Sequence, residues 1–303
     1  MPIKLIKKLF LKTLPLFLSL VIVFNPLAQP EQKSSKTFLW ETKSNQSKIY
    51  ILGSIHLAKD SLYPLDERIE KAYLESDYLV VEININDLDP TEIQERFLKV
   101  GMYLDGDTFK NHISSETYDL AAKKLADLGI DVAYMGFYKP WFLAISLVTL
   151  ELVKLGFDPQ KGIDQYFLNK AKGQKPILEL ESLKYQLDLF GSFTDQEQDL
   201  FLLSTLSDLD ILQSEVDNMF ATWQRGDAQA LSELMYKSFE KYPQTKSIYY
   251  KLFTKRNKEM VSKIEKYLGS DKTYFVVVGA GHLVGDKGII ALLREKGYQL
   301  NQL

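Results

Sequence analysis

The sequence predicts an α/β protein with a central mixed β-sheet, flanking helices and a large helical insertion. Short runs of β-branched and aromatic residues recur along the chain, and stretches with apolar residues at helical spacing separate them. About ninety residues of helical pattern precede the last such run, which is far more than one crossover helix needs. We therefore expect helices at about 182–270 to be inserted between two strands and packed over the sheet.

The first two strands are predicted to form a β-hairpin. Residues 37–41 and 48–52 are rich in apolar and aromatic side chains, and the polar turn 44–47 separates them. The second strand is expected to end at Gly53.

Four helices are predicted in the first half of the chain, where apolar residues recur at helical spacing. The fourth is unusually apolar, since residues 141–150 carry no charge. Roughly ten to fourteen apolar residues are too few to span a bilayer of about 30 Å, so we expect a buried core helix there. The predicted helices are residues 64–76, 91–100, 116–128 and 140–153.

Three further strands complete the predicted sheet. Residues 78–81 and 176–180 are short apolar runs, and residues 273–278, with the core Tyr-Phe-Val-Val-Val, give the clearest strand signal. No fixed-period repeat or low-complexity tract is present, and no linker marks a second domain. We therefore expect residues 29–303 to form one domain.

The first 28 residues are predicted to be an export signal. Four lysines precede an apolar stretch from Leu14 to Phe24, as in a signal peptide. Ala28 suits the last position before a cleavage site but Pro26 suits the third-last position poorly, so an uncleaved N-terminal membrane anchor is the alternative. Both alternatives predict a periplasmic or extracellular body.

Composition excludes several classes of function. The chain has 37 basic and 40 acidic residues, and without residues 1–28 it has 33 and 40, a net charge of −7. No basic face is dense enough to follow a phosphate backbone, so we expect no nucleic-acid partner. The absence of cysteine excludes thiolate metal sites, a thiol nucleophile and disulfides. Any metal must bind His, Asp or Glu.

Polar side chains that can bind a metal follow four of the predicted strands. In open α/β sheets, ligands bind outside the carboxyl ends of the strands, so these side chains are expected to meet. Imidazole and carboxylate groups suit divalent zinc, manganese, cobalt or iron, and a metal-bound water is a nucleophile at neutral pH. A carboxylate that does not bind the metal can act as general base. The four residues are His56, Glu82, Glu181 and His282, and Glu179 replaces Glu181 if the strand register slips by two.

Both histidines occur in a Gly-x-x-His context, beginning at Gly53 and at Gly279. We expect each glycine to supply the conformational freedom for a sharp turn after its strand. The alternative is that each histidine only bonds backbone groups at its turn, but the pair with two carboxylates favours a metal site. The third histidine, His112, lies at a polar helix entry and is expected to be exposed.

Other catalytic motifs are absent or incomplete. The segment Gly279-Ala-Gly-His-Leu-Val-Gly285 resembles a dinucleotide fingerprint, but its last glycine falls one residue late and little chain follows it. Neither His-Glu-x-x-His nor Gly-x-Ser-x-Gly occurs, so a zincin helix and a nucleophile elbow are not expected.

Eight short segments spread along the chain form a characteristic series. They are Gly53-Ser-Ile-His56-Leu, Glu82, Lys139-Pro140-Trp141, Gly162-Ile-Asp164, Leu180-Glu181 with Gln186, Trp223 with Gly226-Asp227, Arg256-Asn257, and Gly279-Ala-Gly-His282-Leu-Val-Gly285. Their combination and order resemble the TraB/GumN family, which includes the Tiki membrane metalloproteases. The resemblance implies a mixed α/β fold, an active site built from the two Gly-x-x-His motifs and acidic residues, and a divalent metal, which is manganese or cobalt in the Tiki branch.

The resemblance also makes Arg256 a candidate for holding a substrate carboxylate or an acidic site residue, for which its planar guanidinium is suited. A surface role on its basic helix is the alternative. The predicted metal ligands are thus His56, His282, Glu82 and Glu181, and the catalytic candidates are Glu82, Glu181 and Arg256. The metal is Mn, Co or Zn.

The predicted function is that of an exported metal-dependent hydrolase, most specifically a peptidase that cuts peptides or exposed protein termini. One alternative is a protein that captures a peptide or saccharide in the same cleft without turnover. Another is hydrolysis of a small ester or lactone at the same metal site. A chelator should abolish hydrolysis, whereas a captured ligand should keep its mass.

Overall fold

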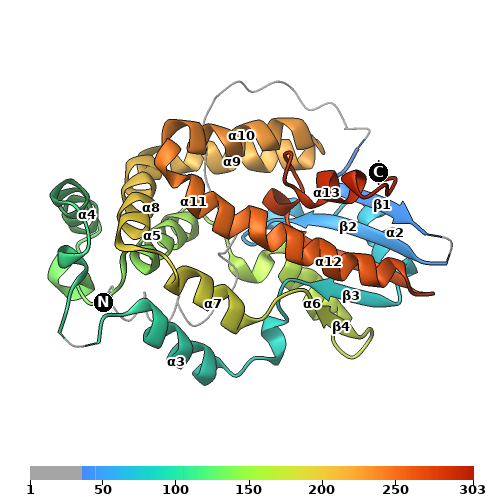
Figure 1. The fold of residues 1–303 in the computed structure, drawn as a ribbon, viewed down its shortest axis with the longest axis horizontal. Helices are drawn as coiled ribbons and strands as arrows, with labels where there is room; N and C mark the ends of the chain where they lie inside the picture. The colour runs from blue at the N-terminus through green and yellow to red at the C-terminus, as the bar shows by residue number, and fades with distance from the viewer. Residues whose placement is uncertain (1–35, 45, 105) are drawn as a thin grey trace.

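A mixed six-stranded sheet forms the centre of the computed structural model, which describes residues 36–44, 46–104 and 106–303, without the side chains of residues 237–241. The strand order is β4-β3-β5-β2-β1-β6 (Figure 1). The predicted export signal, residues 1–28, lies outside the described residues. The strands are β1 (Leu39–Lys43), β2 (Lys48–Ser54), β3 (Tyr78–Val81), β4 (Ile177–Glu179), β5 (Thr273–Gly279) and β6 (Asn301–Gln302).

Four neighbouring strands of this sheet run parallel. β2 pairs with β5, β5 with β3 and β3 with β4 in parallel, whereas β1 pairs with β2 and β6 pairs with β1 in antiparallel. The predicted α/β class and the predicted hairpin are therefore confirmed, and the carboxyl ends of β2, β3, β4 and β5 lie at one edge of the sheet. β6 has only two residues and gave no sequence signal.

Helices fill the connections between the strands. The four predicted helices begin within three residues of their expected starts. The first begins at Glu67 rather than Pro64, because the Asp66 carboxylate accepts the backbone N–H of Arg68 and caps the helix. The described helices are α2 (Glu67–Glu75), α3 (Pro90–Gly101), α4 (Ser115–Asp127), α5 (Pro140–Lys154), α6 (Ile163–Ala171), α7 (Leu183–Gly191), α8 (Asp195–Asp208), α9 (Leu212–Gln224), α10 (Ala228–Lys241), α11 (Lys246–Tyr249), α12 (Arg256–Leu268) and α13 (Ile289–Glu295), with a π-helical stretch at Tyr250–Lys255 before α12.

The apolar helix α5 is a core helix, as the sequence predicts. Every residue from Pro140 to Thr149 is buried, including Trp141 at 0% exposure, and α5 packs against α8 and α9. Among the described residues, no helix has both the length and the apolar character that a membrane span requires.

Helices cover both faces of the sheet. Side chains alternate across a strand, so Tyr274 and Phe275 of β5 point to opposite faces. Tyr274 stacks on Tyr267 of α12, whereas Phe275 contacts Tyr73 of α2 and Phe167 of α6. Figure 1 shows α12 lying across the near face of the sheet, with α5, α8 and α4 at the other end of the molecule.

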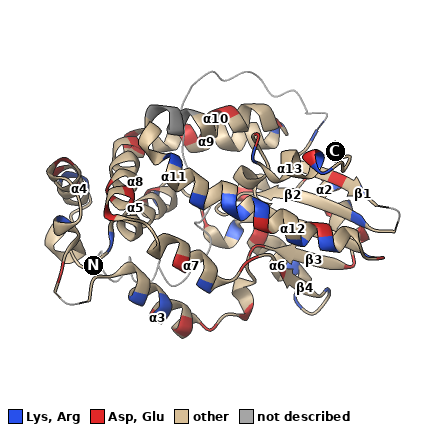
Figure 2. Ribbon diagram, viewed as in Figure 1, with Lys and Arg blue, Asp and Glu red and all other residues tan. Residues whose placement is uncertain are grey.

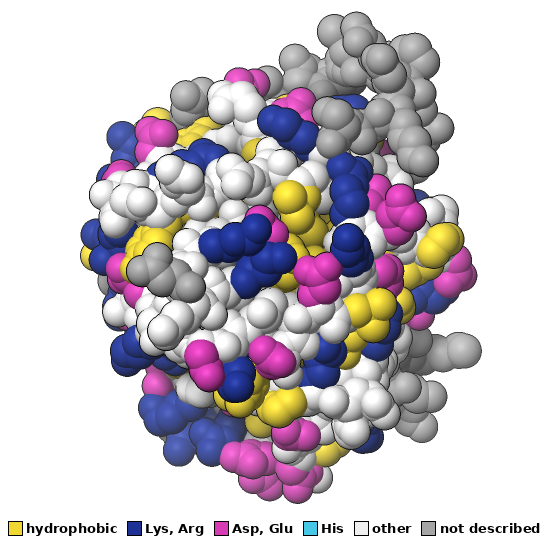
Figure 3. Space-filling model, turned by 90° about the vertical axis from the view of Figure 1, so that its right-hand side faces the viewer, with side chains coloured by type: hydrophobic (Ala, Val, Ile, Leu, Met, Phe, Trp, Pro, Cys, Tyr) yellow, Lys and Arg dark blue, Asp and Glu magenta, His cyan; other side chains and the backbone are white. Residues whose placement is uncertain are grey.

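Charged residues of both signs are interspersed along the helices (Figure 2), and the sheet end of the molecule shows the same mixture between small hydrophobic areas (Figure 3). Pairs such as Lys184–Asp188 are largely exposed. Exposed ion pairs contribute only up to about 1 kcal/mol each, so the stability of the fold must come from its buried core.

Candidate functional site

His56 lies just beyond the end of β2, where a helix N-terminus holds its ring. Its Nδ1 is 3.0 Å from Oδ1 of Asp164 in the first turn of α6. Gly162 makes this approach possible, because a Cβ there would lie 2.3 Å from the carbonyl oxygen of His56. The backbone N–H of Ile163 also donates to the carbonyl of Ile55. The Gly-Ile-Asp segment is therefore packed directly on the backbone of the first Gly-x-x-His motif.

The Asp164 carboxylate changes the acid–base behaviour of His56. Burial lowers the pKa of the imidazole, but the charge and hydrogen bond of Asp164 outweigh burial, so that the pKa of His56 is raised above its ordinary value. A carboxylate on Nδ1 also fixes the ring orientation and directs Nε2 away from it, an arrangement common behind metal-binding histidines.

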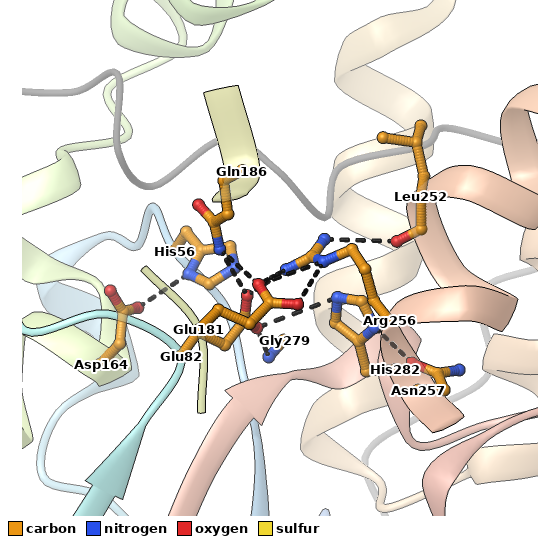
Figure 4. Close-up of polar contacts among 10 residues, drawn as sticks. All are labelled: His56, Glu82, Asp164, Glu181, Gln186, Leu252, Arg256, Asn257, Gly279 and His282. Carbon is orange, nitrogen blue, oxygen red and sulfur yellow. Dashed lines mark hydrogen bonds and ion pairs between the residues drawn. The ribbon is translucent and has the colours of Figure 1, made fainter. Parts of the chain in front are cut away.

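Glu82 and Glu181 lie side by side at the centre of the site, and both face the same edge of one arginine (Figure 4). Arg256 is fully buried; its Nε lies 2.8 Å from Oε1 of Glu181, and its Nη2 lies 2.7 Å from Oε2 of Glu181 and 2.7 Å from Oε2 of Glu82. The two carboxylates raise the pKa of Arg256 against the effect of burial. A surface role for Arg256 is therefore wrong, and the guanidinium holds two acidic residues together.

Two further donors complete the environment of the carboxylates. The amide of Gln186 donates to Oε2 of Glu181 at 2.8 Å, and the backbone N–H of Gly279 donates to Oε1 of Glu82 at 2.7 Å. Glu179, the alternative to Glu181, instead accepts the backbone N–H of Asn84 at 2.6 Å. The strand register thus places Glu181 in the site.

His282 lies on the other side of the carboxylates from His56 (Figure 4) and is fully buried. Its Nδ1 is 2.6 Å from Oδ1 of Asn257, whose amide nitrogen donates to the carbonyl of Lys287. Because the amide oxygen accepts, Nδ1 carries the proton and Nε2 carries a lone pair. This Nε2 has no hydrogen-bond partner among the described residues and lies 3.9 Å from Oε1 of Glu82.

The imidazole of His282 is neutral in this environment. Burial and the nearby Arg256 charge move its pKa well below the ordinary value. The contact between His282 and Glu82 is consequently not an ion pair, although the two atoms are within ion-pair distance. A neutral, oriented and unpartnered Nε2 is the form in which histidine binds a metal.

The two glycines that open the Gly-x-x-His motifs act differently from the expectation. Gly279 has φ −51°, and Gly53 lies within β2, so neither belongs to the positive-φ glycines of the described chain. A Cβ on Gly53 would lie 2.6 Å from the Phe38 ring and 3.1 Å from the Ala280 backbone. Close packing, not turn freedom, accounts for glycine at position 53.

The donor set fits a metal only in part. Two donors at about 2.0–2.2 Å from one tetrahedral ion lie roughly 3.4 Å apart, so the 3.9 Å between His282 Nε2 and Glu82 Oε1 would have to shorten slightly on binding. However, within residues 36–44, 46–104 and 106–303 no group of three or more His, Asp or Glu side chains is arranged to hold an ion. His282 and Glu82 thus lie close together, but the four predicted ligands do not form an arranged metal site in the described part of the chain.

Sequence reasoning assigned no role to three residues that shape this site. Asp164, Gln186 and Asn257 occur in the segments that carry the family resemblance, but only the structure shows that they orient His56, Glu181 and His282. His112 was expected to be exposed, but the structure shows it half-buried. Its ring is stacked on Tyr103 and bonded to Asp107 and Asp195, in a group separate from this site.

Comparison with known proteins identifies one matching family and several similar proteins. A model of the TraB/PrgY/gumN family matches residues 38–302. The uncharacterised protein YbaP of Escherichia coli strain K12 is 26% identical over 81% of this chain and 87% of YbaP. An uncharacterised protein of Treponema pallidum is 26% identical over 63% of this chain and 57% of its own length. A protein of Amphimedon queenslandica named as a homologue of the metalloprotease TIKI is 22% identical over 89% of this chain and 62% of its own length. No solved structure matches.

Proposed function

Because the chain belongs to the TraB/PrgY/gumN family, we propose that it is a metal-dependent hydrolase and, more specifically, a peptidase that acts outside the cytoplasm. The observation that carries the proposal is the neutral, fully buried Nε2 of His282, which faces a carboxylate oxygen of Glu82 at 3.9 Å. The relative named as a TIKI metalloprotease homologue supports the reaction class. The lysines and apolar stretch within residues 1–28 support export.

Three residues would hold the metal in this proposal: His56, Glu82 and His282. Glu82 is preferred to Glu181 as a ligand, because both oxygens of Glu181 are bonded to Arg256 and its side chain is only 2% exposed. The ion, Mn, Co or Zn, would supply Lewis-acid polarisation of the peptide carbonyl and a water of lowered pKa.

The remaining residues of the site act by positioning. Asp164 and Asn257 fix the two imidazole rings from behind, so each ring presents Nε2. Arg256 cannot touch a substrate without movement, since it is fully buried, and it instead holds Oε2 of Glu82 and leaves Oε1 directed at His282. Glu181 in turn holds Arg256, and the amide of Gln186 holds Glu181. The site is therefore pre-organised, which is how such sites lower a barrier.

Metal analysis tests the ligand assignment. The purified protein would be incubated with Mn²⁺, Co²⁺ or Zn²⁺, and its bound metal would be measured beside that of H56A, H282A and E82Q. His112→Ala is the matched control, because this histidine lies outside the site. We expect loss of metal in the three site variants and no loss in the control. Equal metal content in all proteins would remove the assignment.

Turnover separates hydrolysis from the competing function, capture of a peptide without cleavage. That alternative is favoured by the lack of a group of three donors already arranged for an ion in the described part of the chain. Defined peptide mixtures would be incubated with the metal-loaded protein and followed by mass spectrometry. Peptides of reduced mass that disappear with a chelator support the peptidase, whereas peptides that bind and keep their mass support capture.

A further inference from the structure

A small cavity of about 50 Å³ lies beside His56. One side is formed by the strand ends, with Ser54 and the backbone of Gly279 to Gly281, and the other side is formed by α9 and α10. Its side-chain walls are mostly apolar, since α9 contributes Val216, Met219 and Phe220, and no Lys, Arg, Asp or Glu lines the cavity.

The dimensions of the cavity match one aliphatic side chain. One water needs a cavity of at least about 10–15 Å³, so about 50 Å³ has room for a few water-sized groups. A leucine or methionine side chain has four non-hydrogen atoms. Met219 and Phe220 are half-buried, so the cavity has a wall that reaches the surface and an entrance for such a group.

The cavity is fixed by packing and does not depend on a flexible loop. The indole N–H of Trp223, which also lines it, donates to the carbonyl of Gly53 at 2.7 Å and ties α9 to the end of β2. On the opposite wall, Met235 of α10 packs closely against Gly281, where a Cβ would lie 2.8 Å from the Met235 side chain. A rigid apolar cavity discriminates side chains by size.

We propose that this cavity binds one aliphatic side chain of a peptide substrate, of the size of leucine or methionine, and thereby places the adjacent peptide bond at His56. The inference rests on the proposed peptidase function. It follows from His56, which lines the cavity and lies across the two carboxylates from His282 (Figure 4). Burial of a CH₂-rich group there gains free energy, whereas a charged side chain would lose its hydration.

Binding without turnover tests the proposal first. Dissociation constants of N-acetyl-leucinamide, N-acetyl-glycinamide and N-acetyl-lysinamide would be measured by ligand-observed NMR on the full chain. We expect the leucine compound to bind at least about tenfold more tightly than the other two. M219F, which fills the cavity, should abolish this preference. Q224F, which adds the same ring at an exposed position of α9, should retain it.

L231F fills the cavity from α10 and serves if M219F does not fold, as judged by thermal unfolding. Equal binding of the three compounds, or a leucine preference that survives both filling variants, would overturn the inference. Cleavage sites in defined peptides give the second readout, and they should lie next to Leu or Met and shift toward Phe in M219A. Chelator-sensitive cleavage without any side-chain preference refutes the cavity alone. A leucine preference in binding without cleavage refutes the peptidase alone.

Discussion

Replacement of Arg256 by methionine should be one of the most destabilising single changes in this protein. The guanidinium is fully buried and makes three hydrogen bonds of 2.7–2.8 Å to Glu82 and Glu181. Methionine has a similar length but no charge, so two carboxylates with 10% and 2% side-chain exposure would lose their counter-ion. Removing one partner of a buried ion pair costs about 3–5 kcal/mol, because the other charge stays buried.

Urea unfolding at pH 7 would measure this cost as a change in the free energy of unfolding. Lys184→Met is the matched control, since Lys184 and its partner Asp188 are 69% and 56% exposed and such a pair contributes at most about 1 kcal/mol. The triple variant E82Q/E181Q/R256M should recover most of the lost stability, because it removes both carboxylate charges together with the guanidinium.

The reasoning is refuted if R256M and K184M lose equal stability. It is also refuted if the triple variant is less stable than R256M, since the buried carboxylate charges would then not be the source of the cost. Metal binding by R256M would in addition report whether Oε1 of Glu82 stays in place without the guanidinium.

Three further outcomes are expected. Gly162→Ala should cost about 1–3 kcal/mol and reduce metal binding, because its Cβ would meet the carbonyl oxygen of His56 at 2.3 Å. Asn257→Leu should weaken metal affinity about 10–100-fold, measured by competition with a chelator, because the ring of His282 would lose the acceptor on Nδ1. Hydrogen bonds to Asp195 and Asp107 raise the pKa of His112. The stability that His112 contributes is therefore complete below about pH 6.5 and is lost as the pH rises past the raised pKa. The free energy of unfolding of wild type, measured at pH 5.5 and 8.5, should fall relative to that of H112Q.

Each of these expectations has a control. Gly269→Ala is matched to Gly162→Ala, since its Cβ would meet only Lys266 O, at 3.4 Å. Equal losses in both variants would contradict the packing argument. Unchanged metal affinity in N257L would show that the tautomer of His282 does not depend on Asn257. A stability difference between wild type and H112Q that grows with pH would contradict the assigned direction.

Much of this fold could be predicted because local patterns and tertiary packing agree. The strand at 273–278 is a continuous apolar run, and it became the centre of the sheet, buried on both faces. The histidines and glutamates after the strands met because parallel strands end at one edge. The two-residue β6 could not be predicted, since its only cause is pairing with β1.

The orientation of the site residues could not be read from the sequence. Asp164 and Asn257 lie on different helices, and their contacts with His56 and His282 depend on how α6 and α12 pack on the sheet. The predicted role of Gly53 was wrong for the same reason, because the close approach of Phe38 that excludes a Cβ at this position exists only in the folded protein. Arg256 stood in a basic stretch, and charge alone gave no sign of its burial.

The consecutive residues Arg256 and Asn257 open helix α12 and point about 100° apart around its axis. Arg256 donates hydrogen bonds to Glu82 and Glu181, and Asn257 accepts a hydrogen bond from the ring of His282. The π-helical turn just before them supplies the carbonyl of Leu252, which accepts a hydrogen bond from Nη1 of Arg256. A rotation or shift of helix α12 would therefore move the Glu82–Glu181 pair and the ring of His282 together, so the position of one cannot change without that of the other.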